Sequence, residues 1–445
     1  MQQLSYDKRT LTGWLAAAVT VAAFAKTFVP FYLIGSTAIF VAATALGLAL
    51  AAMNWRRLRD DVRRVPEVLV ALVLLYGVVI ASFLAYSLPA VPITHLAGIL
   101  IFHALFLLFG FAAARATRMV LLMLLAGAAV YVLIIVQHTL RFGDVMRDNH
   151  INDVFGVGNP TMFNTFHQNI GLGLGLGALT AFGLASNWLR LAIVWAALPL
   201  LLIFLFHIGA RTALVALVGS FLFLAFAACW VRAKKATTLA VAAAIVAIAI
   251  GSAVLFHYGM QDRTVDPAAN DAVSRTIREL RDPDPQFRVQ IWSRTLRQIA
   301  SEPYLLPLGR GVGMFPVNEG FGPPDWLLRP TEGSKHYAHN IYLDVLYESG
   351  LAGLLPVVFL TLFPLAASLR RWRSLSPAEK SLISVYVFIL LGAQLSGAFA
   401  RSYLELFFIA MAVGIVAAKR AGETAISAQP MSEGKLDPGY PARVP

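Results

Sequence analysis

The sequence has little charge and almost no cysteine. Charged residues make up 13% of its 445 residues, whereas a soluble globular domain carries about 25%. A single cysteine, Cys229, excludes a disulfide framework and does not reveal the redox compartment. The shortage of charge excludes an ordinary soluble domain. Hydrophobic residues make up 58% of the chain, and the charged residues lie in groups between long apolar runs.

The apolar runs have the length of membrane-spanning helices. About 20 apolar residues in a helix cross a hydrocarbon core of roughly 30 Å. The runs lack the alternation of apolar and polar residues that barrel strands show, so helices remain as the way to satisfy the backbone in lipid. We predict an all-α polytopic membrane protein with about 12 transmembrane helices. Their expected positions are 11–28, 30–52, 66–88, 92–113, 117–138, 167–187, 189–208, 212–231, 236–256, 340–368, 379–398 and 401–418. The helix from 340 is expected to tilt or break near Gly353 and Pro356.

Basic residues mark every second loop of this arrangement. Because Lys and Arg remain on the cytoplasmic side of a membrane, both termini are expected in the cytoplasm and the longest loop outside it. The net charge of +12 is then a topology signal, and we expect no nucleic-acid partner. The basic groups are Arg56 to Arg64, Arg115 with Arg118, Arg190, Arg232 to Lys235, Arg370 to Lys380, and Lys419 with Arg420.

The longest loop divides the chain. We expect nine transmembrane helices in residues 1–256, an external loop with amphipathic helices in 257–338, three more helices in 339–420 and a disordered cytoplasmic tail in 421–445. The first apolar run resembles a signal peptide that ends at Ala23-Phe24-Ala25, but we interpret it as an uncleaved helix. In the loop, residues 285–300 are typical of a helix lying along the membrane surface. Its expected apolar stripe is Phe287, Ile291, Trp292, Leu296 and Ile299.

Three residues on the external side can carry chemistry. His339 follows His336 where the loop re-enters the membrane, and it suits either a general base or an interfacial aromatic belt. Arg211 lies between two apolar spans on a side that the topology rule disfavours for arginine, so it either has a function or reaches the lipid headgroups. Arg288 adjoins the expected surface helix. Two guanidinium groups and an imidazole could together hold a diphosphate and deprotonate an incoming hydroxyl.

Other polar residues favour different interpretations. A catalytic metal is the competing idea, but Asp282 and Asp284 are separated by a proline and have no histidine nearby. Asp344 and Glu348 lie four residues apart on one helix face, where they could orient the histidine or form a structural ion pair. Arg401 and Glu405 have the same spacing and are interpreted as an ion pair that serves packing.

The residues His339-Asn340, followed by nine residues and then Gly350-Leu351-Ala352-Gly353, resemble a known motif. Together with the layout of spans and loop, the chain is similar to the O-antigen ligase and polymerase family of bacterial membrane proteins. The resemblance implies a membrane-embedded glycosyltransferase C-type (GT-C) fold in the bacterial inner membrane, with a periplasmic active site. It also implies an inverting, metal-independent transfer without a cofactor, from an undecaprenyl-diphosphate-linked O antigen to the lipid A core.

Carried onto this chain, the resemblance assigns roles to individual residues. His339 would activate the acceptor hydroxyl, and Arg211 and Arg288 would bind the donor diphosphate. Asn340, His336 and Arg310 would support them, and the second histidine leaves open which of the two is the base. An O-antigen polymerase, a protein O-oligosaccharyltransferase, a transporter or flippase of lipid-linked glycans, and a structural subunit remain the alternatives.

Overall fold

The computed structural model describes residues 11–20, 36–142, 160–185, 188–207, 210–232, 288–325, 327 and 331–427, and every regular element in these ranges is a helix. Five stretches are long and apolar enough to cross a membrane: Pro66–Ser87, Ile93–Gln137, Arg211–Trp230, Ile341–Arg370 and Pro377–Ser396. The prediction of a helical membrane protein is therefore confirmed. The number of spans and the GT-C fold remain predictions, and the expected span at 236–256 lies outside the described residues.

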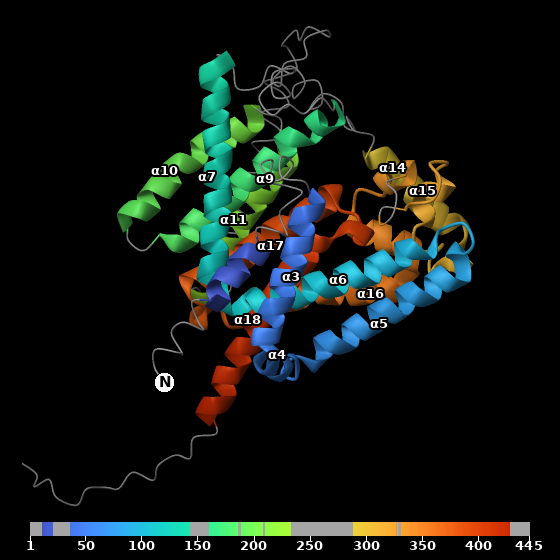
Figure 1. The fold of residues 1–445 in the computed structure, drawn as a ribbon, viewed down its shortest axis with the longest axis horizontal. Helices are drawn as coiled ribbons and strands as arrows, with labels where there is room; N and C mark the ends of the chain where they lie inside the picture. Colours follow the sequence, from blue (N-terminus) through green and yellow to red (C-terminus); the bar gives the residue numbers. More distant parts are fainter. Residues whose placement is uncertain are drawn as a thin grey trace, which may run out of the picture.

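The helices form two neighbouring groups (Figure 1). In one group α5 packs along α16, and α18 packs against α6 and α17. In the other, α9 contacts α7, α10 and α11, and α17 joins the groups by packing on both α9 and α11. The helices are α3 (Ser36–Met53), α4 (Trp55–Val62), α5 (Pro66–Ser82), α6 (Ile93–Ala113), α7 (Thr117–Phe142), α9 (Pro160–Leu184), α10 (Trp188–His207), α11 (Arg211–Arg232), α14 (Arg288–Ser301), α15 (Met314–Asn318), α16 (Ile341–Arg370), α17 (Pro377–Ser396) and α18 (Tyr403–Ser427).

Two helices extend beyond the apolar runs that predicted them. The sixth span was expected at 167–187, but α9 begins at Pro160, and α18 continues to Ser427 instead of ending near 418. Hydropathy finds only the part of a helix that suits lipid, whereas the backbone pattern continues through polar residues such as Lys419 and Glu423. Residues 428–445 of the expected tail lie outside the described residues.

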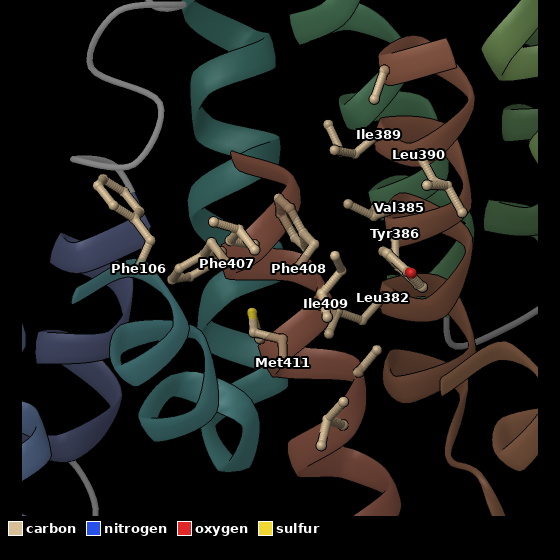
Figure 2. Close-up of a cluster of buried hydrophobic side chains, with 14 of the residues drawn as sticks. Phe106, Leu382, Val385, Tyr386, Ile389, Leu390, Phe407, Phe408, Ile409 and Met411 are labelled. Carbon is tan, nitrogen blue, oxygen red and sulfur yellow. The ribbon is translucent and has the colours of Figure 1, made fainter. Parts of the chain in front are cut away.

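The core is centred on α18, which lies between α6 and α17 (Figure 2). Phe407 and Phe408 are fully buried neighbours with ring centroids 5.3 Å apart. Figure 2 shows Phe407 near Phe106 of α6, and Phe408 on the side that faces Tyr386 of α17. Burying an aromatic or aliphatic side chain of this size stabilises a fold by about 1.5–3 kcal/mol relative to water. In lipid the gain is mainly from packing, because the surrounding chains are also apolar.

Glycines along α9 allow three different helices to approach it. Gly173 and Gly177 face Tyr131 and Ala128 of α7, respectively. Gly171 faces Ala210 at the start of α11, and Gly175 faces the ring of Phe388 in α17. Small residues four apart on a membrane helix let a neighbouring helix pack at close range. These glycines therefore let α7, α11 and α17 pack closely on α9.

Basic side chains gather at one end of the bundle, which we call the arginine end. Asp61 of α4 is 4% exposed and accepts hydrogen bonds from Arg115 after α6 (2.7–3.0 Å) and from Arg64 (2.8 Å). Arg420 of α18 forms an ion pair with Glu67 of α5 at 2.7 Å. The buried carboxylate therefore ties α4 to the turn between α6 and α7, and Arg420 donates to the carbonyl of Arg64 at 2.7 Å, so these three of the expected basic groups lie together. Lys234 and Lys235 lie outside the described residues.

At the other end of the bundle, α16 is broken at Gly350, where φ is 65° and ψ is −165°. A tilt or break was expected near Gly353 and Pro356, and the break lies three residues before Gly353. The carbonyl oxygens of Tyr347 and Glu348 accept from the N–H groups of Arg310 (2.8 Å) and Gly311 (3.1 Å). The N–H groups of Leu351 and Ala352 donate to the carbonyls of Leu306 (2.8 Å) and Pro307 (3.0 Å). An unbroken helix would pair Leu351 with Tyr347 and Ala352 with Glu348. The four hydrogen bonds to the loop take the place of these two.

Replacing Gly350 by alanine should destabilise the protein strongly. Its φ and ψ lie in a region that only glycine adopts readily, at a cost of about 1–3 kcal/mol for other residues. A Cβ atom would also lie 2.5 Å from the nitrogen of Gly309 and the carbonyl oxygen of Leu306. We expect Gly350→Ala to lower the melting temperature in detergent by several degrees. Gly77→Ala is the matched control, since nothing lies within 4 Å of its Cβ position in α5, and equal melting of the two variants would contradict the prediction.

Candidate active site at the head of α16

In the segment before α16, both backbone groups of Ala338 form hydrogen bonds to other parts of the chain. Its N–H donates to Oδ1 of Asp344 at 3.3 Å, and its carbonyl accepts from the indole Nε1 of Trp292 in α14 at 2.9 Å. Ala338 is fully buried. Asp344 also accepts from the N–H of Phe399 at 2.9 Å, so it links the segment to the turn between α17 and α18. His339 is therefore presented from a backbone that three parts of the chain hold in place.

Asn340 begins α16 as its N-cap. Its Oδ1 accepts from the N–H groups of Tyr342 and Leu343, both at 3.0 Å, which satisfies two donors that the helix itself leaves open. Its Nδ2 donates to the carbonyl of Gln394 near the end of α17 at 3.1 Å. His339, directly before it, has φ of 55°, an uncommon value for a residue other than glycine. The cap fixes where the helix starts and so where the imidazole lies.

The helix α14 brings Arg288 to this place. It was expected at 285–300 and occupies Arg288–Ser301. Ile291 and Ile299 pack on a small cluster that contains Phe315, Ala338 and Tyr347. The expected apolar stripe is wrong at Leu296, which is 52% exposed, while Thr295 takes the buried position. The hydrogen bond from Trp292 to the carbonyl of Ala338 fixes which face of α14 is turned toward the protein.

The surroundings of His339 keep its imidazole neutral. Burial, then the positive charge of Arg288 and then that of His336, together lower the pKa of His339 to about 4. Its Nδ1 is buried without a hydrogen-bond partner among the described residues. Of the two charged residues that act on this pKa, Arg288 at the start of α14 has the larger effect. A neutral imidazole beside a permanent cation can accept a proton, and the cation can hold an anion.

Two of the supporting residues have partners in the surrounding loop. The ring of His336 stacks on Phe321 with centroids 3.3 Å apart, and its Nε2 lies 3.2 Å from a carboxylate oxygen of Glu332. Arg310 donates to the carbonyl of Gln298 at 2.5 Å and pairs with Glu302 at 3.1 Å. Arg310 thus joins the end of α14 to the loop that docks at the break in α16.

Arg211 lies at the same end of the bundle as His339. Its helix α11 runs antiparallel to α17, since Gly219 faces Leu391 and Phe223 contacts Trp372 before α17 begins. Arg211 precedes Gly219 by eight residues, or about 12 Å of helix. This distance takes Arg211 to the level of the end of α17, where Gln394 accepts the hydrogen bond from Asn340.

Residues 195–358 match the sequence model of a protein family described as O-antigen ligase. Over this range the chain is similar to that family. The matched range contains Arg211, Arg288, His339 and the two glycines of the motif, so the family resemblance found in the sequence is confirmed. No curated protein matches the chain.

The candidate site also contains residues to which the sequence assigned no role in it. The ring of Tyr337 lies 4.2 Å from that of His339, and its hydroxyl forms a hydrogen bond with Ser396. Burial raises the pKa of Tyr337, and the charges of Arg401 and Arg288 oppose that rise. Arg401 was interpreted as the ion-pair partner of Glu405, but the structure shows no such pair and places it beside Tyr337. The sequence held one signal for this role of Arg401. Like Arg211, it was expected on the side of the membrane where arginine is disfavoured.

The cap on α16 predicts how Asn340 tolerates substitution. Asn340→Ala removes the oxygen that accepts two N–H groups and should destabilise the protein by about 1 kcal/mol. Asn340→Ser keeps a capping oxygen and should melt within a degree or two of the parent protein. The measurement is thermal unfolding in detergent with both variants side by side. If Asn340→Ser melts as low as Asn340→Ala, the capping role is wrong.

Proposed function

We propose that the protein is an O-antigen ligase of the bacterial inner membrane. It transfers an undecaprenyl-diphosphate-linked O antigen to the lipid A core at the periplasmic face, in lipopolysaccharide synthesis. The observation that supports this best is the neutral imidazole of His339 beside Arg288, at the position of the family motif. The pair supplies a base for the acceptor hydroxyl and a cation for the diphosphate.

The proposed reaction is a single inverting displacement. The imidazole of His339 takes the proton from an acceptor hydroxyl, and the oxygen attacks the anomeric carbon of the donor sugar. The bond between that carbon and the diphosphate oxygen breaks with its electron pair on the diphosphate. Arg288 and Arg211 stabilise the developing charge by two-pronged hydrogen bonds to phosphate oxygens. The acceptor oxygen and the diphosphate lie on opposite faces of the sugar, so its configuration inverts.

The charge of the donor also affects the base. A histidine with a pKa near 4 is neutral at pH 7 but is a weak base. An anionic diphosphate next to Arg288 would oppose the charge that lowers this pKa, and His339 would become more basic when the donor is bound. Deprotonation of the acceptor would thus be favoured once the donor is in place.

The direct test is a reconstituted reaction with purified enzyme and lipid-linked glycan. Lipid A core, a second lipid-linked glycan and an acceptor protein are offered in parallel, with EDTA present. A ligase transfers to lipid A core, a polymerase extends the lipid-linked glycan, and a protein O-oligosaccharyltransferase modifies the protein. Transport without any transfer product would contradict the proposal, as would a transfer that EDTA abolishes.

Substitution of each histidine should identify the base. His339→Ala should reduce transfer by about 10²–10⁴-fold, the usual contribution of a general base. His336→Ala should retain most of the activity, because His336 is stacked on Phe321 and paired with Glu332. Both variants are compared at equal amounts of inserted protein, by the rate of product formation on lipid A core. The opposite order would assign the base to His336.

The pH dependence should follow the lowered pKa of His339. The active form has a neutral imidazole, so kcat/KM falls only as pH drops toward about 4 instead of the ordinary 6.5. In Arg288→Gln the pKa should rise toward its ordinary value, and the acid limb of the residual activity should move to higher pH. Arg294→Gln is the matched control, because Arg294 lies on the exposed face of α14 and pairs with Glu319. An acid limb near 6.5 in the parent enzyme would contradict this account.

A further inference from the structure

A second site lies at the arginine end of the bundle, away from His339. A groove of about 430 Å³ opens between α4, the start of α5, the end of α6 and the middle of α18. Its size falls within the range of small-molecule sites, roughly 300–1,000 Å³. Its walls are formed by apolar side chains such as Leu72 of α5, Leu108 of α6 and Val413 of α18.

The mouth of the groove is basic. Arg59 and Arg63 are the charged residues among those that line it. Arg59 lies 3.5 Å from Asp60, but both side chains are about half exposed, and such ion pairs are weak. Asp61 is turned away and held by Arg115 and Arg64. The charge at the mouth is therefore positive, and an anion is its natural partner.

The groove opens beside a surface that suits lipid. The neighbouring face of α5 exposes Leu69, Val70 and Val73 by 49–65%, in a stretch long and apolar enough to cross a membrane. Trp55, 61% exposed, lies at the rim, as tryptophan does at the boundary between hydrocarbon and headgroups. A polar ligand would lose its hydrogen bonds to water against these walls. The occupant must therefore combine a long apolar chain with an anionic head.

We propose that this groove binds one anionic phospholipid from the leaflet next to the arginine end. One acyl chain would lie against Leu72, Leu108 and Val413, and the phosphate would lie between Arg59 and Arg63. Guanidinium groups bind phosphate oxygens with two hydrogen bonds at once. The lipid would contact α4, α5, α6 and α18 together, and so would stabilise the end of the bundle that the Asp61 network also holds.

The test is lipid binding to the full-length protein purified in a neutral detergent. Phosphatidylglycerol and phosphatidylcholine with identical acyl chains are titrated, and bound lipid is counted by native mass spectrometry alongside the melting temperature. We expect saturable binding of one phosphatidylglycerol with a rise in melting temperature, and clearly weaker binding of phosphatidylcholine. The double variant Arg59→Gln/Arg63→Gln should bind phosphatidylglycerol at least about tenfold more weakly.

Matched controls separate a built site from general attraction. Arg56→Gln/Arg370→Gln removes two exposed arginines that do not line the groove, and it should bind phosphatidylglycerol like the parent protein. Leu108→Trp fills the groove and should weaken the binding of both lipids. Equal binding of the two lipids by the parent protein, or equal loss in the two double variants, would overturn the proposal. The arginine variants alone decide the result if Leu108→Trp fails to insert.

Discussion

The candidate site depends on an exchange of backbone hydrogen bonds at Gly350. An unbroken α16 would pair Leu351 with Tyr347 and Ala352 with Glu348, as helical geometry requires. Instead, all four groups bond to the loop from Leu306 to Gly311. Because none of these groups is left without a partner, the break costs little beyond the conformation that glycine supplies. The exchange attaches the loop before α16 to the membrane helix, and α14 with Arg288 is attached through that loop.

Two buried carboxylates, one helical turn apart in α16, also attach the loop to this helix. Asp344 accepts from the N–H groups of Ala338 and Phe399, and Glu348 accepts from those of Gly313 and Phe315. From the sequence, these two residues were expected either to orient the histidine or to form a structural ion pair. The structure shows them as acceptors for loop backbone, which gives Asp344 a positioning role directly before His339. A buried carboxylate that accepts such bonds is satisfied without a cation nearby.

Much of the helical framework could be predicted from the sequence, because apolar length and basic loops follow from the thickness and asymmetry of the membrane. Among the described helices, the predicted ranges of α6, α11 and α17 lie within a few residues of the observed ones. The break at Gly350 and the role of Arg401 could not be predicted, since both depend on which distant backbone or ring lies opposite. The motif located His339 and Asn340, but only the structure explains Asn340 as the cap that fixes the start of α16.

Charges of both signs act on the site. Asp344 raises the pKa of Tyr337, whereas Arg401 and Arg288 lower it. Arg288, followed by His336, also lowers the pKa of His339. A guanidinium that disfavours a charged imidazole also favours an anionic ligand at the same place. Burial and the charge of Arg288 together keep His339 neutral, so the preference for an anion and the protonation state of the base share one cause, the charge of Arg288.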